Sequence, residues 1–129
     1  MKVISKLIVC LILVVGISFG LLSDSASAAL FTKSCRDTNL NGATLSSSCK
    51  DRSGNYKSTS IGLNPFIGNS DGVLQWGSQN FSNTCEGIRL EGAGALFANC
   101  KRRNGSSNNT SINLDDRISN NNGNLTFDR

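Results

Sequence analysis

Short runs of alternating polar and apolar residues are the main pattern after residue 28, and the clearest lies at residues 58–63. Alternation with a period of two is typical of a half-buried strand. Asn64-Pro65 follows, and because asparagine caps helices and proline suits the first helical position, we predict a short helical turn through Phe66-Ile67. Asp71-Gly72 then predicts a hairpin turn, with its return strand at residues 73–76.

The same series of elements occurs again near the C-terminus. A strand is predicted at residues 111–114, a helical turn at 115–118, a hairpin turn at Asn122-Gly123 and a return strand at 124–127. No stretch after residue 28 has the period of a long helix. We therefore predict a mainly β fold. Because such short strands cannot bury a face alone, the two copies are expected to pack together or to exchange hairpins.

This recurrence is an internal repeat of about 50 residues. A shift of 50 places Phe31 on Phe81 and Cys35 on Cys85; after one extra residue in the second copy, a shift of 51 continues the match. Further matched positions are Leu40 and Leu90, Gly42 and Gly92, Cys49 and Cys100, Leu63 and Leu114, Ile67 and Ile118, Asn69 and Asn120, and Trp76 and Phe127. Repeat 1 is placed at about residues 30–79 and repeat 2 at about residues 80–129.

The N-terminal segment has the features of a signal peptide. Lys2 and Lys6 precede an uncharged run at residues 7–22, and Ala26-Ser27-Ala28 has the form of a signal-peptidase site. A membrane anchor is the alternative, but the run is shorter than the roughly 20 apolar residues of a spanning helix. A lipoprotein signal at Cys10 is disfavoured, because Cys10 lies at the start of the apolar run. We expect cleavage near Ala28, a domain at residues 29–129, no membrane insertion afterwards, and a secreted or periplasmic location.

Removal of Cys10 with that segment leaves an even number of cysteines. Cys35, Cys49, Cys85 and Cys100 indicate two disulfides in an oxidising compartment. Zinc binding is the alternative, but no pair has the short spacing of a metal cluster. Four cysteines allow three connectivities; Cys35–Cys49 with Cys85–Cys100 is the one that gives both repeats the same local bridge.

Composition limits the chemistry available. The 129 residues carry a net charge of +4 and no histidine, which excludes Ser-His-Asp and Cys-His sites and removes the commonest metal ligand. Aromatic residues make up only 6%, so the core must be small. Asn, Ser and Gly are abundant, as in low-complexity chains, but they fall at matched positions of the repeat. We expect neither an enzyme nor a bound cofactor or metal.

Several segments together resemble the cyanovirin-N homology family. They are Phe31–Cys35, the cysteine spacings of 14 and 15, residues 60–64, residues 69–76 and residues 111–116, in a resemblance that extends over about residues 30–129. It implies a β lectin of two pseudo-symmetric lobes made by hairpin exchange. Each lobe would carry a site for the α1,2-linked mannose of high-mannose oligosaccharides or glycoproteins.

The same resemblance implies two sets of sugar-binding residues. The mid-chain lobe would use Asn69, Asp71, Gln79, Asn80, Asn83, Thr84, Lys101, Arg102, Arg103 and Gly105. The terminal lobe would use Lys33, Ser34, Lys50, Arg52, Asn120 and Asn122. In the first set Asn83, Arg102 and Gly105 depart from the family pattern, and in the second Lys50, Arg52 and Asn122 do. We therefore expect the mid-chain lobe to be the main site.

Structural interpretations of the same residues stay open. Asn and Asp are common in turns for conformational reasons alone. Asp115-Asp116 is interpreted as a helical cap, since Asp115 matches Asn64, rather than as a glycosidase carboxylate pair. Trp76 and Phe127 are interpreted as core residues. The basic run 101–103 is not expected to bind nucleic acid, because the charge is low and aromatic residues are not interleaved.

Two functions from different classes follow. The first is a secreted, mannose-binding lectin. The second is a structural or protein-interaction module that keeps the fold without binding sugar. We expect a monomer, with a domain-swapped dimer through the junction at residues 77–80 as the alternative.

Overall fold

The computed structural model describes residues 30–129 and is mainly β, as predicted. The strands are β1 (Cys35–Asn41), β2 (Thr44–Lys50), β3 (Tyr56–Gly62), β4 (Ile67–Ser70), β5 (Val73–Trp76), β6 (Cys85–Glu91), β7 (Ala95–Lys101), β8 (Ser107–Asn113), β9 (Ile118–Asn121) and β10 (Asn124–Phe127). Three 3-10 turns accompany them: η2 (Phe31–Lys33), η3 (Phe81–Asn83) and η4 (Leu114–Asp116). The predicted signal peptide, residues 1–28, lies outside the described residues. Within residues 30–129, no helix is long and apolar enough to cross a membrane.

Each repeat contributes one antiparallel three-stranded sheet and one two-stranded hairpin. The sheets have the orders β1-β2-β3 and β6-β7-β8, and the hairpins are β4-β5 and β9-β10. A bulge interrupts the register of β1 between Arg36 and Asn39, and a bulge at the matching place interrupts β6 between Glu86 and Arg89. The repeat found in the sequence is therefore a repeat of complete structural units.

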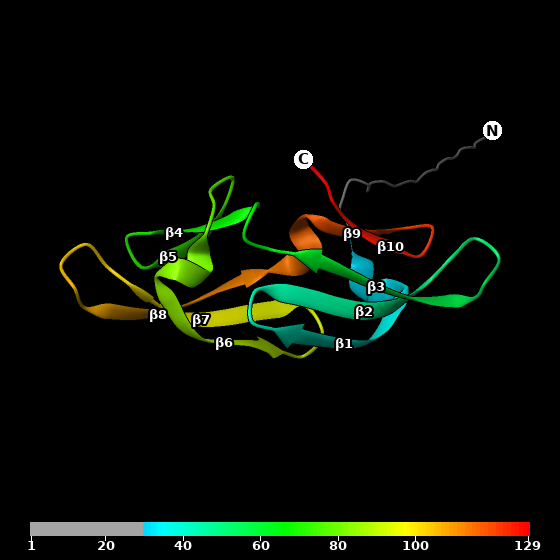
Figure 1. The fold of residues 1–129 in the computed structure, drawn as a ribbon, viewed down its shortest axis with the longest axis horizontal. Helices are drawn as coiled ribbons and strands as arrows, with labels where there is room; N and C mark the ends of the chain where they lie inside the picture. Colours follow the sequence, from blue (N-terminus) through cyan, green and yellow to red (C-terminus); the bar gives the residue numbers. More distant parts are fainter. Residues whose placement is uncertain (1–29) are drawn as a thin grey trace, which may run out of the picture.

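The hairpins are exchanged between the repeats. In Figure 1, β4-β5 of repeat 1 lies above the sheet of repeat 2, and β9-β10 of repeat 2 lies above the sheet of repeat 1. Two matched hydrogen bonds fix this arrangement: Leu74 N–H donates to Thr110 Oγ1 at 3.1 Å, and Leu125 N–H donates to Thr59 Oγ1 at 3.0 Å. The predicted fold of two pseudo-symmetric lobes is confirmed.

The core consists of repeat-related pairs. The side chains with 0% exposure include Phe31 and Phe81, Leu45 and Leu96, Leu63 and Leu114, Ile67 and Ile118, and Cys49 and Cys100. They belong to one continuous cluster, to which both repeats contribute. Burying each large apolar side chain contributes about 1.5–3 kcal/mol of stabilisation. Removing the hairpin of the other repeat from either lobe would expose apolar side chains and lose much of that stabilisation.

Both predicted disulfides are present. Cys35 bonds to Cys49 and Cys85 to Cys100, with sequence separations of 14 and 15 residues. In each case the two cysteines are directly opposite partners on neighbouring strands. Among the described residues, no group of three or more Cys, Asp or Glu side chains could hold a metal ion.

The two predicted hairpin turns are also present. Asp71 and Gly72 have φ angles of 49° and 91°, and Asn122 and Gly123 have 53° and 90°. Two successive positive φ angles are the signature of the turn that matches the twist of a hairpin, which explains why Asx-Gly stands at both places.

The predicted capping role of Asp115 needs a correction. Its carboxylate does not cap η4, which Asn113 caps by accepting a hydrogen bond from Asp115 N–H at 3.1 Å. Instead Asp115 Oδ1 accepts Thr32 N–H of η2 at 3.0 Å, and Thr32 Oγ1 donates to Oδ2. Asn64 does the same for η3, where its side chain accepts Ser82 N–H at 3.2 Å. Asp115 lies inside η4 rather than before it, so its carboxylate serves the turn of the other repeat.

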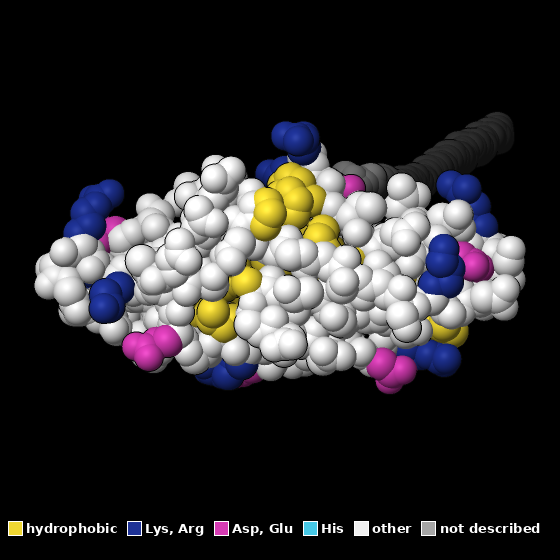
Figure 2. All heavy atoms as spheres, viewed as in Figure 1, with side chains coloured by type: hydrophobic (Ala, Val, Ile, Leu, Met, Phe, Trp, Pro, Cys, Tyr) yellow, Lys and Arg dark blue, Asp and Glu magenta, His cyan; other side chains and the backbone are white. Residues whose placement is uncertain are grey.

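A partly buried aromatic cluster lies where the two hairpins meet. Phe66 stacks on Phe127 with ring centroids 4.2 Å apart, and Trp76 lies 5.8 Å from Phe127. These rings pack against the core, as predicted for Trp76 and Phe127, but they are not fully buried. Figure 2 shows hydrophobic side chains reaching the surface in the middle of the molecule, near the C-terminus.

Candidate functional site

A polar cleft of about 540 Å³ lies between the β4-β5 hairpin and the start of the β7-β8 loop. It is lined by Asn69, Ser70, Asp71, Gln75, Gly77, Ser78, Thr84, Lys101, Arg102 and Arg103. We call it the mid-chain cleft. Because the hairpin belongs to repeat 1 and the loop to repeat 2, the exchange of hairpins creates this cleft.

Asn69 fixes the hairpin to the neighbouring repeat. Its side-chain nitrogen donates to Thr84 Oγ1 and to Lys101 O, both at 2.9 Å, and its side-chain oxygen accepts Gly72 N–H at 2.7 Å. Both N–H donors of the amide are thus used inside the protein, and only oxygen lone-pair capacity remains for a ligand. Asn69 therefore mainly maintains the shape of the cleft, and it has little hydrogen-bonding capacity left for a ligand.

Asp71 has one oxygen engaged and one available. Its Oδ1 accepts Arg103 N–H at 2.9 Å, which joins the tip of the hairpin to the β7-β8 loop. No hydrogen bond from residues 30–129 reaches the second oxygen, Oδ2. A carboxylate oxygen held in this way can accept a ligand hydroxyl without losing side-chain freedom on binding.

Arg102 lies against the floor of the cleft. Its Nη2 donates to Asn108 Oδ1 at 2.8 Å, and Asn108 Nδ2 donates to Gly72 O at 2.8 Å. The aliphatic part packs on the hairpin turn so closely that a Cβ at Gly72 would lie 2.7 Å from Arg102 Cγ. The glycine required by the turn angle is therefore also required by this contact.

The structure brings together most of the residues predicted for this lobe. Asn69, Asp71, Thr84, Lys101, Arg102 and Arg103 line the mid-chain cleft, whereas Gln79, Asn80, Asn83 and Gly105 do not. Asn80 precedes η3 as its N-cap, where its N–H donates to Asn64 O at 2.8 Å, and Asn83 is the last residue of η3. Four lining residues were not predicted: Ser70, Gln75, Gly77 and Ser78. Ser70 and Gln75 lie at exposed positions on β4 and β5, the two strands that the Asp71-Gly72 turn joins. Their polar side chains close to the predicted turn could have indicated them as further binding residues.

The terminal lobe has a smaller counterpart, the terminal cleft. It measures about 380 Å³ and is lined by Ser34, Lys50, Asp51, Arg52, Asn120, Asn121 and Asn122. Of the residues predicted there, only Lys33 does not line it. Asp51 and Asn121 were not predicted.

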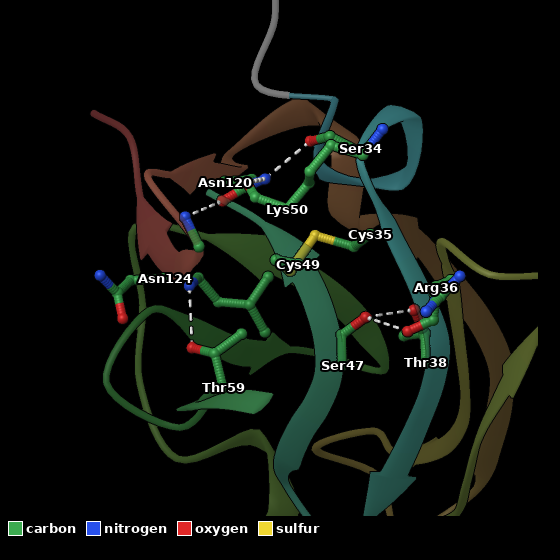
Figure 3. Close-up of a disulfide and its surroundings, with 12 residues drawn as sticks. Ser34, Cys35, Arg36, Thr38, Ser47, Cys49, Lys50, Thr59, Asn120 and Asn124 are labelled. Carbon is green, nitrogen blue, oxygen red and sulfur yellow. Dashed lines mark hydrogen bonds between the residues drawn. A yellow bond between two sulfur atoms is a disulfide. The ribbon is translucent and has the colours of Figure 1, made fainter. Parts of the chain in front are cut away.

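The bonds that shape the terminal cleft repeat those of the mid-chain cleft. Figure 3 shows Asn120 beside Ser34 and Lys50; its side-chain nitrogen donates to Ser34 Oγ at 2.8 Å and to Lys50 O at 2.9 Å. Asn122 Oδ1 accepts Arg52 N–H at 2.9 Å, as Asp71 does for Arg103. The two clefts thus share a backbone frame and differ in the side chains placed upon it.

The principal difference is charge. Three cations and one carboxylate line the mid-chain cleft, which gives it a formal charge of +2. Two cations and one carboxylate line the terminal cleft, which gives +1. The difference in charge arises at two pairs of matched positions. Asp71 in the mid-chain cleft corresponds to Asn122 in the terminal cleft, and Arg102 corresponds to Asp51. Asp51 is also engaged locally, since its Oδ1 accepts Ser53 N–H and Asn55 N–H at 2.9 and 3.0 Å.

These clefts offer hydrogen bonds of both directions on a rigid frame. Hydroxyl groups of Ser and Thr donate and accept, carboxylates accept, and Lys and Arg donate. Such a set suits a ligand dense in hydroxyl groups. No histidine is present in the chain, and the carboxylate of Asp115 is occupied by Thr32.

Known proteins are similar to this chain in fold and in sequence. Residues 31–126 match the family model described as the CVNH domain. The Cyanovirin-N homolog of Tuber borchii is 38% identical over 89 residues, which cover 67% of this chain and 84% of that protein. The Gibberella zeae CVNH structure superposes with a TM-score of 0.70 at 32% identity, over 75% of this chain and 95% of that chain. Microvirin, solved as a complex with mannobiose, gives a TM-score of 0.67 at 38% identity, over 75% of this chain and 96% of that chain.

Proposed function

Since the chain belongs to the cyanovirin-N homology family, we propose that it is a lectin for mannose-rich glycans and binds them mainly in the mid-chain cleft. The family relationship covers residues 31–126 and therefore both repeats. The ligand proposed is the α1,2-linked mannose of high-mannose oligosaccharides or glycoproteins.

One observation carries the proposal. The mid-chain cleft presents Asp71 Oδ2, the Thr84 and serine hydroxyls and the basic side chains around a cavity whose walls are joined by Asn69 and by the Asp71–Arg103 bond. The volume of about 540 Å³ lies within the roughly 300–1,000 Å³ range of ligand clefts. Pre-formed polar groups lower the entropy cost of holding a sugar by its hydroxyls.

The relatives support this ligand class. Microvirin has the same fold, is 38% identical to this chain and was solved as a complex with mannobiose, which supports a mannose-containing ligand here. The matched arrangement of two clefts further suggests that two weak sites on one chain could act together on a branched glycan.

The remaining parts of the proposal concern location and assembly. We propose that residues 1–28 direct export and are removed near Ala28, which suits a domain with two disulfides. The mature protein would act as a monomer without an enzymatic activity or a bound cofactor.

A mannose-rich glycan array tests the proposal. The purified, disulfide-bonded protein is expected to bind high-mannose glycans, and Asp71→Ala and Arg103→Ala are expected to lose that signal. Asn122→Ala is the matched variant in the terminal cleft and is expected to keep it. Because Asp71→Ala also removes the acceptor for Arg103 N–H, circular dichroism must show that the variant stays folded. A folded wild-type protein that is silent on the array would overturn the proposal.

A specific observation keeps a second function in view. Asn69, Asp71, Asn120 and Asn122 all use side-chain atoms to hold their hairpins, so the fold alone is a sufficient reason for their presence. A structural or protein-interaction module would need these residues equally. Normal folding with no glycan binding in either lobe would favour that second function.

A further inference from the structure

The basic residues of the mid-chain cleft point to a narrower ligand than neutral mannose. Resting on the proposed glycan-binding function, we infer that this cleft recognises a glycan carrying a tetrahedral anionic ester, either phosphate or sulfate. The anion would lie beside Lys101, Arg102 and Arg103. The sugar ring would lie beside the hydroxyl groups of Ser70 on β4, of Thr84, and of Ser78 in the junction between the repeats at residues 77–80, which we call the hinge.

The first step is that these cations converge on one place. Lys101 ends β7 and Arg102 and Arg103 follow it directly, yet all three line the same cavity. Figure 2 shows basic side chains at the left end of the molecule, where the β7-β8 loop lies in Figure 1. A bond from Arg103 N–H to Asp71 and packing of Arg102 on the hairpin turn hold this end of the cleft in place.

The second step is that the positive charge is not neutralised within the described residues. The two ion pairs among residues 30–129 are Arg36–Asp37 and Arg89–Glu91, and both lie outside the cleft. The carboxylate in the cleft, Asp71, bonds to the backbone of Arg103 rather than to a basic side chain. A net +2 cavity therefore faces solvent without an internal counter-ion.

The third step is the match in chemistry. A guanidinium group offers paired N–H donors in a geometry that suits phosphate and sulfate oxygens, and such charge-assisted bonds are about twice as strong as neutral ones. Arg102 commits Nη2 to Asn108, which orients the group and leaves its other donors. Lys101 and Arg103 line the same cleft, are exposed, and supply further charged donors for an anion.

Nucleic acid fits the cleft less well. Single-stranded nucleic acid is held by aromatic side chains on which bases stack as well as by basic residues. None of the residues that line the mid-chain cleft is aromatic, whereas four are neutral side chains bearing a hydroxyl or amide on the hairpin and hinge: Asn69, Ser70, Gln75 and Ser78. The combination of a hydroxyl-reading wall and a cationic wall favours a charged sugar.

Calorimetric titration of the disulfide-bonded protein with three probes tests this inference. The probes are α1,2-mannobiose, the same disaccharide with a 6-phosphate on its terminal ring, and the corresponding 6-sulfate. One or both esters are expected to bind about tenfold more tightly than neutral mannobiose in low salt. That advantage should shrink several-fold between about 20 and 300 mM salt, because exposed charges are screened.

Two variants locate the effect. Arg102→Gln and Arg103→Gln each keep a neutral N–H donor, and each is expected to lower affinity for the esters by more than affinity for neutral mannobiose. Because Arg102 also packs on the hairpin, exposed Arg103 supplies the variant that leaves the packing intact. Arg89→Gln removes an equal charge outside both clefts and is expected to keep the preference.

The outcomes are distinguishable. Binding of neutral mannobiose as tight as that of both esters would overturn the inference and leave the lectin proposal standing. No binding of any of the three sugars would overturn the lectin proposal and the inference with it. Equal affinity for inorganic phosphate or single-stranded DNA would show a site that reads charge alone, and would also overturn the inference.

Discussion

The side-chain amide of Asn69 donates to the backbone carbonyl of Lys101, 32 residues further along the chain, at 2.9 Å. The hairpin of repeat 1 is thereby tied to the last residue of β7 in repeat 2. Asn120 makes the same bond to Lys50 O across 70 residues. Each candidate cleft is therefore built on a contact that only the exchanged arrangement can form.

Replacing Asn69 should show how much this contact stabilises the fold. Asn69→Ala removes two donated bonds and one accepted bond, and we expect the free energy of unfolding to fall by about 1–3 kcal/mol. Urea denaturation followed by circular dichroism measures this. Asn120→Ala is the matched variant and should lose a similar amount while leaving glycan binding in the mid-chain cleft intact. An unchanged midpoint for both variants would show that the hairpins are held by the core alone.

The substitution Asp71→Asn distinguishes the role of the carboxylate charge in ligand binding from the role of the side chain in stabilising the fold. Asp71→Asn keeps an oxygen that can accept Arg103 N–H, as Asn122 does for Arg52, so the free energy of unfolding should change by less than about 0.5 kcal/mol. Affinity for neutral mannobiose should fall, because Oδ2 no longer accepts a sugar hydroxyl. Removing the one carboxylate of the cleft should at the same time raise the ratio of ester affinity to mannobiose affinity by roughly two- to fivefold, since exposed charge interactions contribute about 0.5–1 kcal/mol. Titration of both sugars with both proteins measures the two changes, and an unchanged or lower ratio would contradict the charge argument.

The sequence was informative wherever one local rule decided the structure. Asp71-Gly72 and Asn122-Gly123 form the predicted turns because little else can adopt two successive positive φ angles. The predicted return strand at 73–76 is β5, and the strand predicted at 58–63 is β3, Tyr56–Gly62. The repeat added what local rules lack, because the large side chains that are fully buried in the core stand at matched positions of the two copies.

The strands β1 and β2 were not located from the sequence. β2 carries Ser46-Ser47-Ser48, which shows no alternation by residue type, yet Leu45, Ser47 and Cys49 form its buried face. Ser47 is 6% exposed, and its buried hydroxyl is satisfied because it donates to Arg36 O at 3.0 Å and lies 2.7 Å from Thr38 Oγ1 (Figure 3). A bulge in the neighbouring strand provides those partners, and a sequence pattern cannot show such a long-range arrangement.

The sequence predicted individual binding residues of the mid-chain cleft, but it did not predict the full set of residues that line the cavity. Gln79, Asn80 and Asn83 are near the cleft in sequence, but η3 begins at Phe81 and carries Asn83 away from the lining. Ser78 lines the cleft because the hinge crosses β4 closely, a contact between segments with no shared local signal.

The disulfides should matter equally in the two lobes. Each closes a loop of similar length, 14 and 15 residues, so replacing either pair with alanine should lower the free energy of unfolding by about 3 kcal/mol in the chain-entropy model. The Cys35→Ala/Cys49→Ala and Cys85→Ala/Cys100→Ala variants allow a direct comparison by chemical denaturation. A clear loss for one pair and none for the other would show that the lobes do not unfold as one cooperative unit.

Asp115 is expected to act as a structural anchor. Asp115→Ala breaks its two bonds to Thr32, and the free energy of unfolding should fall by about 1–3 kcal/mol. Asp116, its exposed neighbour, is the control, and Asp116→Ala should cost less than about 0.5 kcal/mol. Thermal unfolding distinguishes the two variants. Equal stability of both would mean that η2 does not depend on this carboxylate.

A substitution at Gly68 tests whether the close crossing of the hinge favours the monomer that we propose. It pairs with Asn80 across an isolated bridge, and a Cβ at position 68 would lie 2.8 Å from Gln79 N. Ser119, the equivalent residue of repeat 2, pairs with Leu30 across the matching isolated bridge. Gly68→Ala should therefore push residues 78–79 away from β4 and lower the free energy of unfolding by about 1–3 kcal/mol.

Displacing the hinge should also change the oligomeric state. If the hinge cannot pack against β4, its closed conformation is destabilised. An open hinge would let the β4-β5 hairpin pack on a second chain instead. Light scattering after gel filtration should show a monomer for the wild type and a larger share of dimer for Gly68→Ala. Gly62→Ala is the matched control, because a Cβ at Gly62 meets nothing within 4 Å, and it should stay monomeric. A Gly68→Ala protein as stable and as monomeric as the control would show that the hinge yields without cost, and that the close crossing at Gly68 does not decide which copy of the hairpin is used.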